Sequence, residues 1–353
     1  MTPSFWRGKR VFVTGHTGFK GSWLSLWLHS LGAQVKGYAL APATTPSLFH
    51  LCRLDTLIAS EIASINDYNA LEKSLCAYEP DIVLHLAAQA LVRESYINPL
   101  ETYVTNVIGT AHVLEAVRKS ASVKSIVCIT TDKCYDNKEW VWPYRENEPM
   151  GGHDPYSASK GCAELVVASY RNSFFDTHKI GLATARAGNV IGGGDFSADR
   201  LIPDFIRALL NNETVPLRYP NAIRPWQHVL EPLHGYLLLA EKLWDAPQQF
   251  SGAWNFGPHL EDTKTVAQII DAFIHVYGKG AWIKDPASHP HEAHCLKLDI
   301  SKAETELDWH PALSINATLT MIAEWYQAWD QGLDMLEFTS TQINSFLRRI
   351  SNV

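Results

Sequence analysis

Tyr156 and Lys160, which together can act as an acid–base pair, lie four positions apart in the segment Tyr-Ser-Ala-Ser-Lys. On a helix, residues at this spacing lie on one face, one turn apart. A tyrosine hydroxyl titrates near ~10, and a neighbouring positive charge stabilises its phenolate form. The two residues are therefore candidate catalytic residues that remove a proton from an alcohol. The alternative is a surface pair, since the spacing is common by chance.

A second ionisable pair, Asp132 and Lys133, follows the apolar run 126–129 and two threonines, Thr130 and Thr131. The run predicts a strand, so the pair is expected at its carboxyl end. Asp132 can donate a proton if it stays protonated. Lys133 can remove one only as a neutral amine, with a pKa well below ~10.4, or it can stabilise an enolate as a cation. An exposed ion pair without catalytic function is the alternative.

Three glycines, at positions 15, 18 and 21, separate the apolar run 11–13 from the helix-like segment 22–31. They permit a tight turn, close approach of backbone N–H groups to a pyrophosphate, and close packing of helix on strand. The helix dipole then faces the anion. This pattern predicts a dinucleotide-binding loop with the candidate residues Gly15, Thr17, Gly18, Phe19, Lys20 and Gly21.

The elements that position these residues are predicted by short apolar runs that alternate with longer amphipathic segments. The runs lie at 11–13, 34–38, 82–84, 126–129 and 180–185. The alternation indicates an α/β fold, a Rossmann-type doubly wound parallel sheet with helices on both faces. We assign residues 1–187 to a dinucleotide-binding domain and 188–353 to a smaller, interleaved C-terminal substrate lobe. A strand-like piece at 253–256 predicts a returning segment near 229–257 that rejoins the sheet.

The 353-residue chain is 46% hydrophobic and 19% charged, with a formal net charge of −7. This composition is typical of a folded protein without general attraction for nucleic acid or an anionic membrane, so neither is an expected partner. The longest apolar stretch, Ser22–Leu31, is shorter than the ~20 residues that span a bilayer. No export signal is visible. A cytoplasmic protein is expected, and its six cysteines lack zinc-type spacing.

The glycine spacing G-x-x-G-x-x-G after a threonine, together with the Tyr–Lys pair, resembles the extended short-chain dehydrogenase/reductase family along nearly the whole chain. The resemblance implies a nicotinamide dinucleotide that contacts both Tyr156 and Lys160. It also implies that Asn106 supports catalysis and that Asp67 contacts adenine, although an ordinary helix residue and a helix N-cap are the respective alternatives. The cofactor-lining loop after the fourth strand is Leu86, Ala87, Ala88 and Gln89.

The type of dinucleotide is less specified. An acidic residue that binds the adenosine ribose usually follows the second strand, but Gly37–Ala41 contains none. NAD is the expected cofactor, and NADP is also compatible with this segment.

The segment Thr131–Lys133 resembles the sugar-nucleotide 4,6-dehydratases of the family, whereas its epimerases carry small residues here. The chemistry explains the difference, because epimerisation at C4 needs only the tyrosine and the cofactor. Loss of water across C5 and C6 needs a base for the C5 proton and an acid for the C6 hydroxyl. Asp–Lys, with the surrounding segments 15–23 and 146–152, resembles the CDP-glucose-specific dehydratases.

This resemblance implies a lyase that oxidises C4 of CDP-D-glucose, eliminates water across C5 and C6, and returns the hydride to C6. The product would be CDP-4-keto-6-deoxy-D-glucose, a precursor for deoxysugars such as those of O-antigen. A homodimer, formed through the helices that hold Asn106 and Tyr156, is also implied by the resemblance. The choice of CDP rests on the resemblance alone.

A sugar nucleotide presents a diphosphate, which arginine and amide side chains bind well. The family resemblance implies substrate contacts by Asn189, Arg200, Leu201, Arg224, Trp226 and Glu292. For the two arginines the alternative is a surface salt bridge. The histidines around Glu292 lack the H-E-x-x-H spacing, and Pro290 opposes a helix there, so no metal is predicted.

Two other functions fit part of the pattern. A sugar-nucleotide 4-epimerase or simple dehydrogenase would share Tyr156 and Lys160, but the pair Asp132 and Lys133 disfavours it. A catalytically silent cofactor-binding protein would not need both Tyr156 and Lys160.

Overall fold

A seven-stranded parallel sheet forms the centre of the computed structural model, which describes residues 1–175, 180–287 and 295–351. The strands follow the order β11-β6-β5-β4-β1-β2-β3. Their bounds are β1 (Arg10–Thr14), β2 (Gln34–Ala39), β3 (Ala59–Ile62), β4 (Ile82–His85), β5 (Ser125–Ile129), β6 (Gly181–Ala187) and β11 (Gly252–Phe256). The predicted Rossmann-type α/β fold is confirmed.

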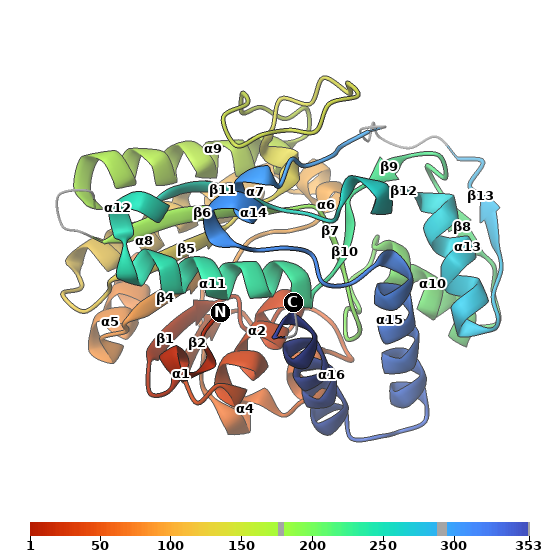
Figure 1. Cartoon of the computed structure of the whole chain (residues 1–353), viewed down its shortest axis with the longest axis horizontal. Helices are drawn as coiled ribbons and strands as arrows, with labels where there is room; N and C mark the ends of the chain where they lie inside the picture. Colours follow the sequence, from red (N-terminus) through yellow and green to blue (C-terminus); the bar gives the residue numbers. More distant parts are fainter. Residues whose placement is uncertain (176–179, 288–294, 352–353) are drawn as a thin grey trace.

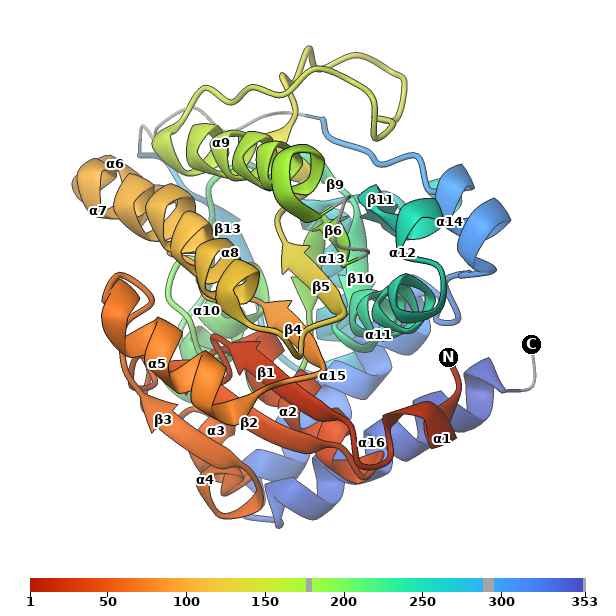
Figure 2. The ribbon, with the colours of Figure 1, turned by 90° about the vertical axis from the view of Figure 1, so that its left-hand side faces the viewer.

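Helices cover both faces of the sheet (Figures 1 and 2). On one face lie α5 (Tyr68–Tyr78), α8 (Gly109–Lys119) and α9 (Pro155–Tyr170). On the other lie α2 (Phe19–Ser30), α11 (Leu230–Asp245) and α16 (Met335–Ile350). Every residue of β4, β5 and β6 is buried as a result. The apolar runs that predicted these strands reflect this double cover.

The edge strand β3 is different, because its residues Ala59–Ile62 are exposed or half-buried. It pairs with β2 on one side only. Its Ser and Glu would interrupt any apolar run, and it was not among the predicted strands. An edge strand needs no continuous apolar run, since it is not buried on both faces.

The smaller lobe contains three two-stranded sheets, β10–β7, β12–β9 and β13–β8. Their strands are β7 (Asn189–Ile191), β8 (Val215–Leu217), β9 (Ile223–Arg224), β10 (Trp226–His228), β12 (Lys264–Thr265) and β13 (Trp282–Lys284). The lobe's helices include α10 (Leu201–Leu210), α13 (Val266–Tyr277) and α15 (Ile315–Asp330) (Figure 1). Between segments of the smaller lobe, the chain returns to the central sheet. There α11 packs on β5 and β6, and β11 pairs with β6.

The remaining elements are short. They are α1 (Pro3–Trp6), α3 (Leu48–Leu51), α4 (Leu54–Leu57), α6 (Val92–Ile97), α7 (Pro99–Tyr103), the π turns η1 (Val104–Ile108) and η3 (Arg171–Phe175), the 3-10 turns η2 (Asp132–Cys134) and η4 (Leu260–Asp262), α12 (Pro247–Phe250) and α14 (Ser301–Leu307). Within the described ranges, no helix has the length and apolar character to cross a membrane.

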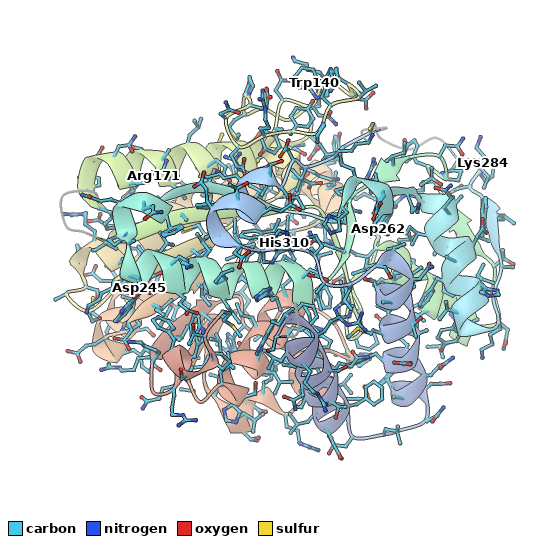
Figure 3. The ribbon with its side chains drawn as sticks, in the orientation of Figure 1. Trp140, Arg171, Asp245, Asp262, Lys284 and His310 are labelled. Carbon is cyan, nitrogen blue, oxygen red and sulfur yellow. The ribbon has the colours of Figure 1, made fainter. Side chains whose placement is uncertain are left out.

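A long loop between η2 and α9 stands above α9, and Figure 3 shows Trp140 in this loop, at the top of the view. Trp140 stacks on Tyr144, with ring centroids 5.3 Å apart, and Tyr144 stacks on the buried Tyr135 at 5.1 Å. The loop is thus anchored to the core by aromatic rings.

Candidate functional site

A cavity of about 800 Å³ lies at the carboxyl ends of the parallel strands. Its lining comes from the segments after β1, β4, β5 and β6 and from the smaller lobe. The strand order changes direction between β1 and β4, and doubly wound sheets bind their ligands at such a point. The cavity is therefore the candidate active site.

The glycine loop forms one wall of this cavity. Gly15 has φ +78°, and a Cβ there would lie 2.7 Å from the backbone nitrogen of Ala87. A Cβ on Gly21 would lie 2.0 Å from the carbonyl oxygen of Gly15. Only glycine fits both positions, so the backbone stays open beside the start of α2, whose N-cap is Gly18. This cradle fits the diphosphate of a dinucleotide.

Hydrogen bonds hold the neighbouring loop in place. The hydroxyl of Thr14 accepts from the backbone nitrogens of Leu86 and Ala87, each at 3.2 Å. The Thr17 hydroxyl donates to the Leu40 carbonyl at 2.8 Å. Leu86 and Ala88 line the cavity, whereas Thr17 and Ala87 shape its wall from behind.

Tyr156 and Lys160 lie one turn apart on α9, and both line the cavity. Asp154 caps the helix by accepting a hydrogen bond from the Ser157 nitrogen at 2.9 Å. Lys160 donates to the carbonyl oxygen of Ile129 at the end of β5, at 3.3 Å. The helix and the strand end thus present both side chains to the same space.

Burial changes the acidity of both groups. It raises the pKa of Tyr156 to about 12, against an opposing hydrogen-bond effect of Thr131. It lowers the pKa of Lys160 to about 8. Tyr156 in this environment is a neutral phenol, and a positive charge placed beside it would favour the phenolate.

Asp132 and Lys133 lie on η2, and both line the same cavity as Tyr156. Asp132 is 2% exposed, and its Oδ1 accepts a hydrogen bond from the Thr131 hydroxyl at 3.0 Å. Its Oδ2 is buried and has no hydrogen-bond partner among the described residues. Burial raises the pKa of Asp132, although Lys133 and Thr131 act in the opposite direction. A raised pKa favours the protonated carboxyl that a general acid needs.

Asn106 lies behind the cavity, in the π turn η1. Its amide donates to the Gln89 carbonyl at 3.0 Å and to the Ser159 hydroxyl at 2.9 Å. Its Oδ1 accepts from the Gln89 nitrogen at 2.9 Å. Asn106 therefore joins the loop after β4 to the helix that carries Tyr156.

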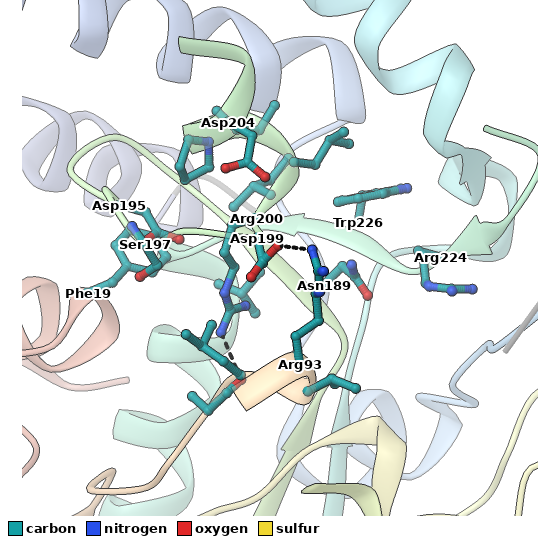
Figure 4. Close-up of a pocket in the computed structure, with 18 of the residues that line it drawn as sticks. Phe19, Arg93, Asn189, Asp195, Ser197, Asp199, Arg200, Asp204, Arg224 and Trp226 are labelled. Atoms are coloured by element: carbon teal, nitrogen blue, oxygen red, sulfur yellow. Dashed lines mark hydrogen bonds and ion pairs between the residues drawn. The ribbon is translucent and has the colours of Figure 1, made fainter. Parts of the chain in front are cut away.

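The smaller lobe supplies the opposite wall (Figure 4). Asn189 on β7 and Trp226 on β10 are partners in a parallel pair, so their side chains come from adjacent strands. Arg224 lies on β9, opposite Lys264 of β12. Arg200 precedes α10 and donates to the Ala90 carbonyl at 3.2 Å. Leu201 begins α10 and also lines the cavity.

The cavity is also lined by arginines that the sequence did not mark as site residues. Arg93 and Arg218 both form ion pairs with Asp199, at 2.8 and 2.9 Å. Figure 4 shows Arg93 next to Asp199, with Arg200 close by. Arg207 pairs with Asp204. No local motif marks Arg93 or Arg218, since they lie 125 positions apart.

Some predicted site residues lie elsewhere. Among the described residues, the cavity lining does not include Thr17, Asp67, Ala87, Gln89 or Asn106. Asp67 is exposed and caps α5 by accepting from the Ala70 nitrogen at 3.1 Å. Glu292 and the nearby histidines lie outside the described residues, and within the described ones no cluster could hold a metal ion.

Comparison with known proteins agrees with this architecture. Residues 12–322 match the model of the GDP-mannose 4,6 dehydratase family. A CDP-glucose 4,6-dehydratase of Salmonella typhimurium is 56% identical over 353 residues, which are 98% of each chain. A dTDP-glucose 4,6-dehydratase of Streptomyces antibioticus is 30% identical over 90% of this chain and 92% of its own.

Solved structures share the fold. The dTDP-glucose 4,6-dehydratase of Streptomyces venezuelae with NAD and TYD bound has a TM-score of 0.79 and 23% identity, and covers 93% of this chain and 99% of its own. The UDP-glucose 4-epimerase of Thermotoga maritima with UDP-glucose has a TM-score of 0.78 and 23% identity, with coverage of 91% and 99%. From the family match and the 56% identical relative, the chain belongs to the GDP-mannose 4,6 dehydratase family, within the extended short-chain dehydrogenases/reductases.

Proposed function

We propose that this chain is an NAD-dependent hydro-lyase that converts CDP-D-glucose into CDP-4-keto-6-deoxy-D-glucose and water. The observation that carries the proposal is a second ionisable pair, Asp132 and Lys133, in the same cavity as Tyr156 and Lys160. A 4-epimerase has no step for that second pair. The 56% identical CDP-glucose 4,6-dehydratase of Salmonella typhimurium supports the choice of substrate.

The cofactor is NAD, held at the glycine loop and the start of α2. Bound at this place, NAD would supply the acceptor for the C4 hydride and the donor of that hydride to C6. The segment Gly37–Ser47 contains no charged residue, so it offers no cation to the 2′-phosphate of NADP. The Streptomyces venezuelae dehydratase of the same fold binds NAD. Titration calorimetry with NAD and NADP tests this choice, and tighter binding of NADP would contradict it.

The chain's own residues move the protons. Tyr156 removes the proton from the C4 hydroxyl, with Lys160 and the cofactor stabilising its phenolate. Asp132 protonates the departing C6 hydroxyl, for which its raised pKa is suited. Lys133 takes the C5 proton as a neutral amine, or it stabilises the enolate as a cation while another group takes that proton. Thr131 holds Asp132, and Asn106 holds the loop and the helix around them.

The smaller lobe binds the nucleotide part of the substrate. Arg200 and Arg224 bind the diphosphate, and their place beside Asn189 and Trp226 in the cavity supports this role. Leu201, which lines the same cavity, is proposed to contact the substrate as well. Glu292, outside the described residues, is proposed to border the nucleoside, and Asp67 to contact the adenine of NAD.

The assembly is a homodimer formed through α8 and α9 and the segments before them. Exposed apolar side chains support it, since Leu100 of α7, which precedes α8, is 76% exposed and Leu165 of α9 is 62% exposed. Sedimentation should give twice the mass of one chain, and a monomer at working concentration would contradict the dimer. The division into lobes 1–187 and 188–353 and a cytoplasmic location complete the proposal and are carried over from the sequence pattern. A role in O-antigen deoxysugar synthesis rests on the sequence resemblance.

A substrate comparison tests the function. The purified protein is incubated with NAD and, separately, CDP-, dTDP-, UDP- and GDP-glucose. We expect the 4-keto-6-deoxy chromophore with CDP-glucose, formed faster than with the other three. A C4 epimer as the only product would identify an epimerase, and binding without any product would identify a catalytically silent protein.

A further inference from the structure

Lys20 is a basic residue inside the glycine loop that the proposed proton transfers do not use. It lies in the first turn of α2 between Gly18 and Gly21, is half-buried, and lines the cavity. Within the described part of the chain, its ammonium group forms no hydrogen bond and no ion pair. Its Nζ lies over the ring of Tyr236 on α11, 6.0 Å from the ring centroid.

Two lysines elsewhere in the chain, unlike Lys20, have acidic partners. Lys36 pairs with Glu61 at 2.9 Å, and Lys119 pairs with Glu72 at 3.0 Å. A cation that is withdrawn from water without a partner costs free energy. The position of Lys20 therefore indicates that a bound group, or a charge that changes during the reaction, interacts with it.

The groups around the cavity that act on Lys20 through their charge, or that lie next to its ammonium group, come from the reaction centre and its surroundings. They are Arg200 before α10, Lys160 on α9, Asp132 on η2 and Tyr236 on α11. Burial, followed by Arg200 and Lys160, lowers the pKa of Lys20 to about 7, and Asp132 acts in the opposite direction. Lys20 thus shares the electrostatic environment of the groups that we assign to catalysis.

Oxidation of the sugar changes one charge in this environment. The oxidised nicotinamide ring is positively charged, and the reduced ring is neutral. A nearby cation repels the oxidised form and leaves the neutral form unaffected. An ammonium group at the reaction centre therefore favours the reduced cofactor.

We propose that Lys20 acts on the reaction centre through its charge, and that it favours oxidation of the sugar at C4 by opposing the positive charge of the oxidised nicotinamide. The inference rests on the proposed NAD-dependent function. Lys20 exchanges no atom in this step, since the C4 hydride goes to the cofactor and the hydroxyl proton goes to Tyr156. At an effective dielectric constant of about 20, one unit charge several ångströms away changes such an equilibrium by about tenfold or more.

The test uses a substrate analogue that stops after oxidation. CDP-6-deoxyglucose has no C6 hydroxyl, so it can be oxidised at C4 but cannot lose water. At saturating NAD and analogue, the ratio of reduced to oxidised bound cofactor is measured from the near-ultraviolet absorbance. We expect Lys20→Met to lower this ratio about tenfold, and Lys20→Arg to keep it near that of the unmodified protein. Lys73→Met, an exposed lysine of α5, is the matched control and should leave the ratio unchanged.

The pH dependence gives a second measurement that needs no neutral variant to fold. Lys20 is charged below its pKa and neutral above it, and bound diphosphates raise that pKa above 7. The measured quantity is the ratio of reduced to oxidised cofactor in the Lys20→Arg protein, divided by the same ratio in the unmodified protein. This quotient should therefore be near one at low pH and rise as the pH passes the pKa of Lys20. Arginine stays charged throughout, so this rise reports Lys20 alone.

Three results would overturn the inference. The first is a Lys20→Met protein that binds NAD more weakly but shows an unchanged ratio at saturation, since Lys20 would then only bind the diphosphate. The second is a cofactor ratio in Lys20→Arg that, divided by the cofactor ratio in the unmodified protein, stays constant with pH. The third is an unmodified protein that binds the analogue and forms no reduced cofactor, which would overturn the proposed function as well. The unmodified protein alone separates that last case from the other two.

Discussion

Helix α9 contributes to two buried clusters of ionisable groups, and they are built in opposite ways. Toward the smaller lobe, Tyr156 and Lys160 face the cavity together with Asp132. On the next turn, Glu164 forms an ion pair with Arg186 of β6 at 2.8 Å, and both side chains are buried. Each carboxylate oxygen of Glu164 accepts two hydrogen bonds, from Arg186 and from Thr130 or Thr184.

The cluster at the cavity, formed by Tyr156, Lys160 and Asp132, has fewer hydrogen bonds and no such ion pair among the described residues. Asp132 Oδ2 has no partner within the described residues, and Lys160 has one long bond to a carbonyl. Burial raises the pKa of Asp132 and Tyr156 and lowers that of Lys160. At Glu164, burial alone would raise the pKa, but the charge and hydrogen bonds of Arg186 outweigh it and hold the pKa below its usual value.

The difference separates structure from function within one helix. Buried charges that are fully paired hold elements together, whereas buried ionisable groups with incomplete pairing and displaced pKa values mark a site that a ligand completes. Substitutions in the Glu164 cluster should therefore reduce stability, and those in the cavity cluster should reduce activity.

The largest effect is expected from Tyr156→Phe, which should lower kcat by as much as about 10⁴-fold. Only a hydroxyl is lost, and the backbone bond of Tyr156 to the Ser95 hydroxyl remains, so the melting temperature should change little. Single-turnover reduction of bound NAD and thermal unfolding measure the two quantities. An undiminished rate of cofactor reduction would show that another group is the base.

Arg186→Met should have the opposite profile. It leaves the buried carboxylate of Glu164 without its cation, which costs about 3 to 5 kcal/mol of unfolding free energy. Activity per folded molecule should fall far less than in Tyr156→Phe, because Arg186 does not line the cavity. Urea unfolding measures the loss.

The double variant Arg186→Met, Glu164→Leu is the control for that prediction. It removes both charges, so it should be more stable than Arg186→Met alone. If the double variant is the less stable of the two, the cost does not come from an unpaired carboxylate.

Asp132→Asn and Lys133→Met should separate dehydration from oxidation. Both variants should still oxidise C4 and accumulate reduced cofactor, but they should release 4-keto-6-deoxy product about 10²-fold more slowly. In the unmodified protein, deuterium placed at C4 should appear at C6 of the same molecule. Wash-out of that label into solvent, or full dehydration by Lys133→Met, would rule out this mechanism.

Asp132→Asn also sharpens the comparison through stability. Because burial raises the pKa of Asp132, the ionised carboxylate costs the folded state free energy at neutral pH. Replacement by the neutral amide should therefore not lower the free energy of unfolding at pH 7, in contrast to Arg186→Met.

Arg224→Ala should weaken substrate binding by about 1.5 to 3 kcal/mol, the usual contribution of a charged hydrogen bond. The KM for CDP-glucose should rise with little change in kcat, because the diphosphate is bound in ground state and transition state alike. Steady-state kinetics measure both constants. An unchanged KM would exclude Arg224 from the substrate site.

The smallest effect is expected in the pH dependence of stability under acidic conditions. The pKa of Glu164 lies below its usual value of 4.5 in the folded state, so its contribution to stability is complete above that pH. The contribution is lost as the pH falls through the lower folded value. The stability difference between the unmodified protein and Arg186→Met should therefore narrow below about pH 4, in urea unfolding at a series of pH values. A constant difference would mean that Glu164 does not titrate in this range.

The sequence by itself determined the features whose geometry is local. Short apolar segments, which are typical of buried strands, predicted six of the strands of the central sheet. Strand β3 was missed because an exposed edge strand has no apolar run. The glycine spacing and the interval from Tyr156 to Lys160 were readable because a strand–turn–helix and a single helical turn fix where those side chains lie.

Only the tertiary structure decided which distant residues meet. It places Arg93 and Arg218 at the cavity and buries Asp132 with an oxygen that has no partner among the described residues. It also places Asn106 outside the cavity lining, where its hydrogen bonds connect the loop after β4 to α9. It also joined Glu164 to Arg186, which no motif connects. These contacts depend on the packing of strands and helices far apart in the chain, and that packing sets burial, and with it which charges are paired and which are free to react.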